Sequence, residues 1–359
     1  SNGNTTKEKD TANGCVKSER REIVVDATCV SADISYPTDL KLLNDARRKS
    51  ERLIDRLHEL SGGEQKKPRT YRERARCEYE EVARLRRARR KVLRRAIKKQ
   101  LGYLRRNLKH IRNYVKRGIG EMLADGEKEL IKLLELVYEQ QRWMYESGVR
   151  SVAGRIVSLS QSHIRPMVRG KLGVPVEFGP KVLVSVVNGF CYVDRIGWEG
   201  YSEGSMLREQ LEKHKQRYSE YPSSVYADRS FKNRRNAELC GSLSVELAGA
   251  PLSVKEIRSA DVEQRRKWKR SEGKRAIVEG KFGQAKRRFG LDRLLMKLKN
   301  TFESAIVLTF IVMNLERLLR KLKSLPENIF SALAECFSFL LSLILEPKGS
   351  PELFSLTVP

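Results

Sequence analysis

The sequence has few of the residues that bind transition metals. Its six cysteines are scattered and none forms a Cys-x-x-Cys pair, and its four histidines do not cluster. A structural zinc site needs several such ligands at close spacing, so the sequence argues against one. Widely scattered thiols are typical of a reducing compartment, in which they stay free.

Acidic residues are also scarce relative to basic ones. The 359 residues include 72 Lys+Arg but 45 Asp+Glu, which gives a formal net charge of +27. This balance favours a polyanionic partner. Nucleic acid is the main candidate, because it neutralises many cations at once and releases condensed counterions. An anionic membrane or another acidic macromolecule is the alternative.

Apolar segments of targeting or membrane type are missing from most of the chain. The first ten residues are almost devoid of apolar side chains, so they show no secretory signal pattern. We expect residues 1–20 to form a disordered linker. Residues 329–345 are an apolar run, but 17 residues are marginal for a membrane span and the run contains Glu335. We expect a packing or dimer helix there and no membrane segment.

Strand-like segments are few and far apart. Residues 21–30 form a short β-branched run, which predicts a buried strand. Residues 181–197 predict a β-hairpin with a tight turn at Gly189, and residues 222–228 predict another short strand. Residues 241–260 have the composition of a loop with at most a weak strand.

Between residues 39 and 148 there is no strand pattern. Thr38 and Asp39 mark a helix start, and residues 61–63 break that helix. Residues 69–118 are dense in Arg and Lys, and residues 127–147 predict a third helix. An apolar stripe runs through the basic segment and consists of Leu85, Val92, Leu93, Ile97, Leu101 and Leu104. Further helices are predicted at residues 202–218, 230–240, 261–289 and 300–322.

Together these elements predict an α/β fold with a large basic helical insertion after the first strand. We expect a discontinuous α/β domain in residues 21–40 and 171–322, and the insertion in residues 41–170. A C-terminal apolar helix and tail would occupy residues 323–359. The basic helices at 69–118 are expected to follow a DNA backbone without reading its sequence, and a solvated helical hairpin is the alternative.

Three acidic residues stand in distinctive contexts. Asp26 follows an apolar strand-like run, Asp228 follows a second one, and Glu279 lies on a basic helix. Adjacent strands can bring the two aspartates together across 202 residues. Carboxylates are the ligands that Mg²⁺ prefers, and a pair of such ions cuts phosphodiester bonds. Each acid alone is more often a cap or a solvated ion pair, so the prediction depends on the joint pattern.

The helix that carries Glu279 also predicts a mixed acidic and basic face. Arg275, Glu279 and Lys286 share this face, because at 100° per residue their directions differ by at most about 40°. The carboxylate there would meet metal while the cations meet phosphate oxygens. Trp268, in a basic segment of the same helix, is a candidate for stacking on an unpaired base. Trp143 and Trp198 are expected to pack in the core.

These segments resemble those of a known family. Residues 23–28 with 36–40, residues 225–229 and residues 279–291 are similar to the segments around the two aspartates and the glutamate of bacterial insertion-sequence DDE transposases. The spacing Arg275-x3-Glu279-x6-Lys286 matches the family's Arg-Glu-Lys signature. Residues 308–315 are similar to the helix that closes the domain. The resemblance covers about residues 20–322.

The resemblance implies a ribonuclease-H-like mixed sheet with flanking helices. It implies that Asp26, Asp228 and Glu279 are catalytic and bind two Mg²⁺ or Mn²⁺ ions. The implied reactions are cleavage of double-stranded DNA at the element's ends and strand transfer into target DNA, by a homodimer in the bacterial cytoplasm and nucleoid. The DNA contacts expected are Arg229, Trp268, Arg275, Lys281, Lys286, Arg287 and Arg288.

The sequence departs from the family pattern in two ways. Glu272 stands where the family often has tyrosine, so an aromatic contact to DNA is either absent or supplied by Trp268. Relatives carry a helical region before the first aspartate, whereas only about 25 residues precede Asp26 here. A truncated or inactive nucleic-acid-binding derivative of the same fold is therefore one alternative, and a general nuclease of that fold is another.

Overall fold

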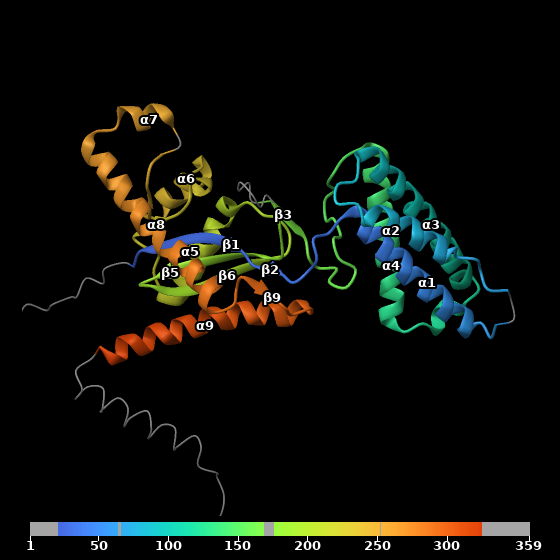
Figure 1. The fold of residues 1–359 in the computed structure, drawn as a ribbon. Helices are drawn as coiled ribbons and strands as arrows, with labels where there is room; N and C mark the ends of the chain where they lie inside the picture. The colour runs from blue at the N-terminus through green and yellow to red at the C-terminus, as the bar shows by residue number, and fades with distance from the viewer. Residues whose placement is uncertain (1–20, 64–65, 169–175, 252, 325–359) are drawn as a thin grey trace, which may run out of the picture.

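The computed structural model describes residues 21–63, 66–168, 176–251 and 253–324. These residues form a sheet unit and a separate helical unit, connected by two chain segments (Figure 1). The predictions for residues 1–20 and for the apolar run 329–345 fall outside the described residues. Within the described ranges, no helix is long and apolar enough to cross a bilayer.

A five-stranded mixed sheet forms the centre of the sheet unit, with the strand order β6-β5-β1-β7-β8. The central strand β1 pairs antiparallel with β5 and parallel with β7, and β7 pairs parallel with β8. The fold is therefore mixed α/β, and it is compatible with the expected ribonuclease-H-like fold. The strands are β1 (Ile23–Cys29), β5 (Lys181–Val187), β6 (Phe190–Gly197), β7 (Ser224–Tyr226) and β8 (Glu246–Ala248).

The hairpin between β5 and β6 confirms the sequence prediction. Asn188 and Gly189 form its turn with φ angles of 50° and 78°. Two successive positive φ angles suit the twist of a two-residue hairpin, and the Asn-Gly pair adopts them at low cost. The short strand β8 lies in the segment for which the sequence indicated at most a weak strand.

Helices cover both faces of this sheet. Alternation along β1 sends Val24 into a core cluster with α8 and α9, while Ile23 and Val25 join a cluster with α5 and α6. Asp26 lies two residues after Val24, so its side chain points to the same face of the sheet, which α8 covers. The helices are α5 (Leu207–Tyr218), α6 (Arg234–Ser242), α7 (Val254–Ser259), α8 (Val262–Arg288) and α9 (Lys299–Lys323), with 3-10 turns η2 (Glu203–Met206) and η3 (Arg229–Phe231).

Two small ladders supplement the main sheet. The strand β2 (Ser31–Ala32) pairs with β9 (Arg293–Leu294), and β3 (Pro166–Val168) pairs with β4 (Val176–Phe178). The sequence indicated none of these strands, because two or three residues are too few to show a period. β3 lies within residues 41–170, where we expected only the helical insertion. It pairs with β4, which belongs to the expected α/β domain.

The helical unit has a core of its own. Its elements are α1 (Asp39–Leu60), α2 (Arg72–Ala83), α3 (Arg90–Lys116), η1 (Ile119–Met122) and α4 (Asp125–Ser147). α1 begins where the sequence predicted, because Thr38 Oγ1 accepts a hydrogen bond from the N–H of Lys41 at 3.2 Å. Leucines of α1, α3 and α4, among them Leu43, Leu104 and Leu134, fill the core between these helices.

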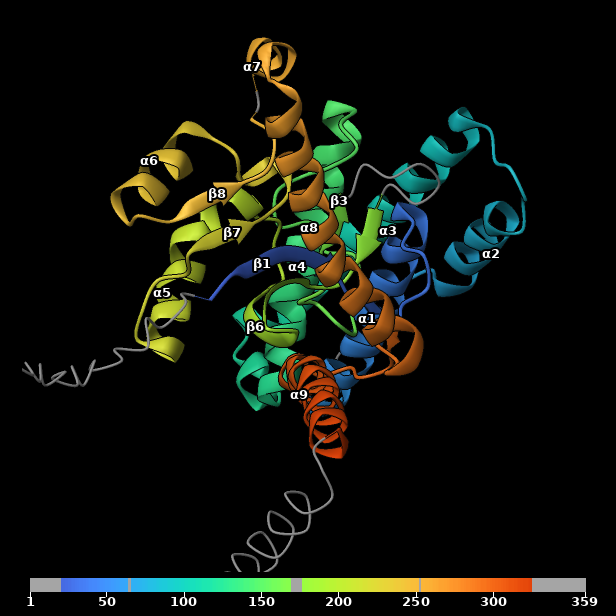
Figure 2. The same cartoon turned by 90° about the vertical axis from the view of Figure 1, so that its left-hand side faces the viewer.

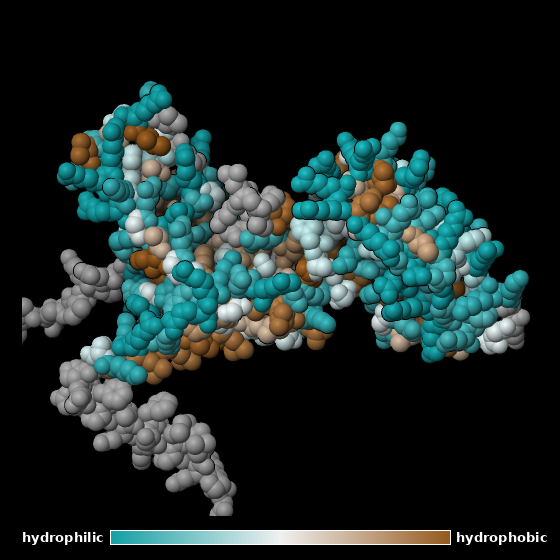
Figure 3. All heavy atoms as spheres, viewed as in Figure 1, coloured by the Kyte–Doolittle hydropathy of each residue, from teal (hydrophilic) through white to brown (hydrophobic). Residues whose placement is uncertain are grey.

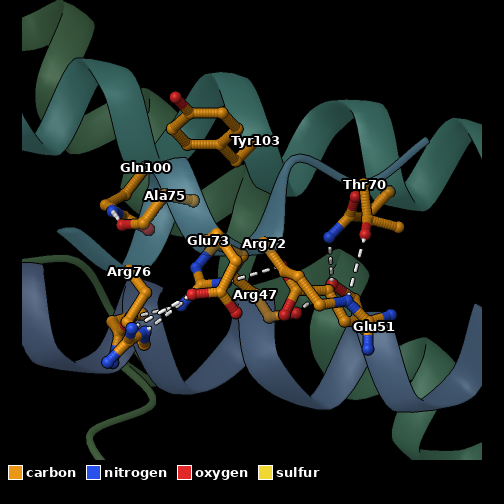
Figure 4. Close-up of polar contacts among 12 residues, drawn as sticks. Arg47, Glu51, Thr70, Arg72, Glu73, Ala75, Arg76, Gln100 and Tyr103 are labelled. Carbon is orange, nitrogen blue, oxygen red and sulfur yellow. Dashed lines mark hydrogen bonds and ion pairs between the residues drawn. The ribbon is translucent and has the colours of Figure 1, made fainter. Parts of the chain in front are cut away.

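Polar contacts link α1, α2 and α3 within this unit (Figure 4). Arg47 is 2% exposed and forms an ion pair of 2.5 Å with Glu51 on the same helix. Gln100 on α3 donates to the carbonyl oxygen of Ala75 on α2 at 2.9 Å. Because a buried polar group is costly when unpaired, such contacts fix the helices in one arrangement.

The basic segment 69–118 differs from its prediction. It divides into α2 and α3, and only the part of the apolar stripe from Ile97 onward packs in or against the core. Leu85, Val92 and Leu93 are exposed, because they lie between the helices or in the first turn of α3, beyond the reach of α1. Trp143 is 49% exposed, so its expected core position is wrong, whereas Trp198 is buried as expected.

Candidate active site

The strand register places the two aspartates level with each other. In the parallel ladder Ile23 lies opposite Val225 and Val24 opposite Tyr226. The same offset of 202 residues puts Asp26 beside Asp228. Asp228 lies two residues after the end of β7 and caps η3, where its Oδ1 accepts the N–H of Arg229 at 2.7 Å. Two distant segments therefore deliver carboxylates to one end of neighbouring parallel strands.

The helix α8 brings the third acid to these strands. It crosses the sheet beside β1 (Figures 1 and 2). Asp261 caps its start by accepting the N–H of Gln264 at 2.7 Å. Val278, Phe282 and Ala285 are buried at helical spacing and hold the helix on the sheet. Glu279, which follows Val278, therefore lies at the border of the buried face.

The three predicted acids line one cavity of about 780 Å³. Arg275 and Lys286 line it too, as the shared helix face predicted. The remaining wall comes from β1, β3 and β5, from the loop and η2 that follow β6, and from two further residues of α8. Those residues are Ala27, Thr28, Cys29, Pro166, Met167, Val168, Lys181, Gly200, Tyr201, Glu203, Phe282 and Gly283.

Arg275 joins two of the acids. Its Nη1 lies 3.1 Å from Asp228 Oδ1, and its Nη2 lies 2.9 Å from Glu279 Oε1. One guanidinium therefore holds a carboxylate from the sheet and one from α8 on its two sides. The sequence predicted these residues on one site but not that the arginine would bridge the acids.

Asp26 lies in an environment that disfavours its charge. Its pKa is raised to about 6, chiefly because burial disfavours the charged form, and the Glu203 and Asp228 carboxylates add repulsion. The N–H of Ala27, which donates to Asp26 Oδ1 at 2.8 Å, and the charge of Arg275 partly offset this rise. Negative charge is thus crowded around Asp26.

Glu203 is a fourth acid of this cavity that the sequence did not reveal. It forms an ion pair of 2.7 Å with Lys181 at the start of β5. Gly204 lets η2 approach η3, because a Cβ there would clash with the carbonyl oxygen of Ser230. No spacing rule points to Glu203. Only the pairing of β1 with β5 and β5 with β6, once known, brings this loop toward Asp26.

The other expected DNA contacts are distributed around the site. Arg229 lines a neighbouring cavity that shares Asp228 and Arg275 with the first. Lys281 lies near Cys191 on β6, where its charge partly offsets the raised pKa of that thiol. Arg288 pairs with Glu316 at 2.9 Å, and Arg287 donates to the carbonyl oxygen of Gly283 at 3.3 Å. Trp268 is half-buried in the outer half of α8.

The donor set fits a hard divalent cation. Carboxylate oxygens from Asp26, Asp228 and Glu279 share a cavity in which like charges repel, and such crowding is relieved by a cation. In the part of the chain that the structure describes, no three acidic, histidine or cysteine side chains lie together closely enough to hold a metal. Arg275 now occupies the space between Asp228 and Glu279 and supplies the positive charge.

Comparison with known proteins gave one match. Residues 225–316 match a family model described as transposase DDE domain. The matched range includes Asp228 and Glu279, whereas Asp26 lies before it. No curated protein and no solved structure matched the chain.

Proposed function

This chain belongs to the DDE transposases, and we propose on that premise that it cuts DNA at the ends of a mobile element and joins them to target DNA. The observation that carries the proposal is the shared cavity of Asp26, Asp228 and Glu279, which come from β1, from the end of β7 and from α8. A cavity lined by these acids together with Lys181, Arg275 and Lys286 suits a phosphodiester substrate better than a neutral one.

Asp26, Asp228 and Glu279 would hold two Mg²⁺ or Mn²⁺ ions. Such ions activate the attacking oxygen and stabilise the leaving oxygen of a phosphodiester. Lys286 and Arg275 are placed to bind non-bridging phosphate oxygens, since both line the same cavity. Arg275 also neutralises Asp228 and Glu279 and so limits the repulsion among the four acids.

The helical unit contributes a second basic surface to this proposal. α3 contains Arg90, Lys91, Arg94, Arg95 and Lys98, all exposed. Exposed cations of this density bind the phosphate backbone without reading base sequence. The homodimer and the nucleoid location implied by the family resemblance stay predictions.

The test of catalysis is removal of single acids. Asp26→Asn, Asp228→Asn and Glu279→Gln should each lower the Mg²⁺-dependent cleavage rate by on the order of 10³-fold or more, because several kcal/mol of transition-state stabilisation are lost. The measurement uses a supercoiled plasmid that carries the native flanks of the gene. DNA binding in EDTA, measured by fluorescence anisotropy, should stay nearly unchanged.

Glu263→Gln is the matched control, because Glu263 is exposed in the first turn of α8 and lines neither of the cavities that contain Asp228. Cleavage retained in any of the three variants would contradict the assignment. Wild-type protein that binds DNA but never nicks it would identify an inactive derivative. Equal cutting of plasmids with and without the flanks would identify a general nuclease.

A further inference from the structure

A second cavity lies where the two units meet. Its volume is about 360 Å³, and it shares no lining residue with the cavity of the acids. One wall is α1 of the helical unit. The other walls are residues 33–35 and Lys297 of the sheet unit and the connecting segment 157–161. The two chain segments that connect the units (Figure 1) therefore both contribute lining residues to this junction cavity.

The lining of the junction cavity is strongly cationic. α1 contributes Lys41, Arg48, Lys49 and Arg52, and the sheet unit contributes Lys297. Lys41, Arg48 and Arg52 share one helix face, because spacings of seven and four residues return to nearly the same direction. The acids present are Asp45 and Asp33, and Asp33 is already paired with Arg293 at 2.5 Å.

In the described part of the chain, most of these cations take part in no ion pair. Among the described residues, no ion pair or hydrogen bond involves the side chains of Arg48, Arg52 or Lys297. Nearer the C-terminal end of α1 a cation is paired, since Arg56 forms an ion pair with Glu59 at 3.6 Å. Burial lowers the pKa of Lys49, whose Nζ lies 3.2 Å from the carbonyl oxygen of Leu159. The cavity thus concentrates positive charge that an anion would stabilise.

The chemistry of the walls favours a phosphate backbone over a base. No aromatic side chain lines the cavity, so there is no platform on which a base can stack. Ser158 and Ser160 add hydroxyl donors to the cations. Guanidinium and hydroxyl groups are the usual contacts to phosphate oxygens, and they position DNA rather than specify its sequence.

We propose that the junction cavity binds the sugar–phosphate backbone of DNA and that the bound strand is contacted by both units at once. This inference rests on the proposed function for the identity of the polyanion. Its consequence is that DNA fixes the orientation of the helical unit relative to the catalytic cavity. This contact lies on α1 and adds to the one expected on the basic helix α3.

The test compares two double variants of the full chain. Arg48→Ala/Arg52→Ala removes two unpaired cations from the cavity. Arg56→Ala/Arg142→Ala removes the same charge from exposed positions that are ion-paired with Glu59 and Glu146. Binding to a fluorescent 30-bp duplex is measured by anisotropy in EDTA over a range of salt concentrations, with circular dichroism as the check on folding.

We expect the cavity variant to bind about 10-fold more weakly at 0.1 M salt. The negative slope of log K against log salt should become shallower by about 2, because two phosphate contacts are lost. The control variant Arg56→Ala/Arg142→Ala should keep the wild-type slope. Arg48→Lys/Arg52→Lys, which retains both charges in the cavity, should have nearly the wild-type slope. Equal losses in both double variants would show a mere net-charge effect and overturn the proposal.

A single variant on the opposite wall tests the bridging. Lys297→Glu should also weaken binding and reduce the slope, because Lys297 belongs to the sheet unit. An unchanged slope in this variant would refute simultaneous contact by both units. Because all these measurements are made without divalent metal, they succeed or fail independently of the cleavage assay on the three acids.

Discussion

At the scale of single residues, Asp26 combines a proposed role at the site with a cost to stability. Its side chain lies in a strand that is paired on both sides, and burial together with Glu203 disfavours its charge. Residues of this kind are common at active sites, where surrounding structure holds groups in states that water would not favour. Protonation of Asp26, or a cation bound beside it, would remove this cost in stability.

The raised pKa of Asp26 predicts a pH-dependent effect of its removal. The folded protein binds a proton at Asp26 near pH 6, but the unfolded chain does so near pH 3.8, so stability falls as the pH rises between these values. Asp26→Asn should therefore raise the free energy of unfolding by about 1–2 kcal/mol at pH 8 in EDTA and hardly at pH 4. Urea denaturation at both pH values measures the difference.

Asp33→Asn is the control for this effect, because Asp33 is exposed and paired with Arg293. It should give no stabilisation at pH 8. If both variants raised the free energy of unfolding at pH 8, the loss of any carboxylate would be stabilising. The environment of Asp26 would then not be the cause.

The residue scale also shows what the sequence reveals about the site. Asp26, Asp228 and Glu279 were predictable, because each stands at the end of an apolar run or on a basic helix in a distinctive order. Glu203 was not, since it reaches the cavity only through the β5–β6 hairpin and a close approach at Gly204. Residues that enter a site through tertiary contacts leave no periodic signal.

At the scale of elements, α9 closes the open edge of the sheet. β6 is an edge strand, and Asn314 of α9 binds its backbone with both ends of the side-chain amide. Oδ1 accepts the N–H of Cys191 at 2.8 Å, and Nδ2 donates to the carbonyl oxygen of the same residue at 2.7 Å. The amide thus replaces a neighbouring strand at this point and protects the edge.

Loss of this contact should destabilise the sheet unit. We expect Asn314→Ala to lower the free energy of unfolding by about 1–3 kcal/mol, because two backbone groups lose their partner. Asn314→Asp, which retains an acceptor for the N–H of Cys191, should cost less if its charge is tolerated at the partly exposed site. Chemical denaturation monitored by tryptophan fluorescence measures both, and an Asn314→Ala variant as stable as the wild type would contradict the role.

The outer side of α9 is largely apolar. Val307, Leu308, Ile311, Leu315 and Leu319 are exposed there, and Figure 3 shows the hydrophobic residues gathered along this helix. The start of α1 followed from the capping residue Thr38 in the sequence. The break between α2 and α3 was missed because residues 84–89 are as basic as the helices on either side, so composition gives no boundary.

At the scale of the whole molecule, the helical unit and the sheet unit have separate cores. The core of the helical unit and the larger core beside α8 share no residue. Only the connecting segment serves both, with Ile156 and Leu159 in the helical core and Val157 and Ile164 in the other. Such a division predicts that the two units unfold as distinct cooperative units.

Core truncations in each unit test this division. Leu104→Ala should lower the stability of the helical unit by about 2–5 kcal/mol, because a fully buried leucine on α3 leaves a cavity. Scanning calorimetry should show one transition moved to lower temperature and the other unchanged. Ile306→Ala on α9 should move the other transition, and a single transition that shifts in both variants would contradict the division.

The attachment of the helical unit has a consequence for the order in which the chain acquires its structure. Arg155 lies 2.6 Å from Asp39, and Gln141 donates to the same carboxylate at 3.0 Å, so the entry and the exit of this unit are tied together. β1 is synthesised long before its partner β5, and an unstructured loop of that length would carry a large closure entropy. Early helix formation from local contacts, followed by this tie, shortens the effective loop and delivers the nascent β5 to β1.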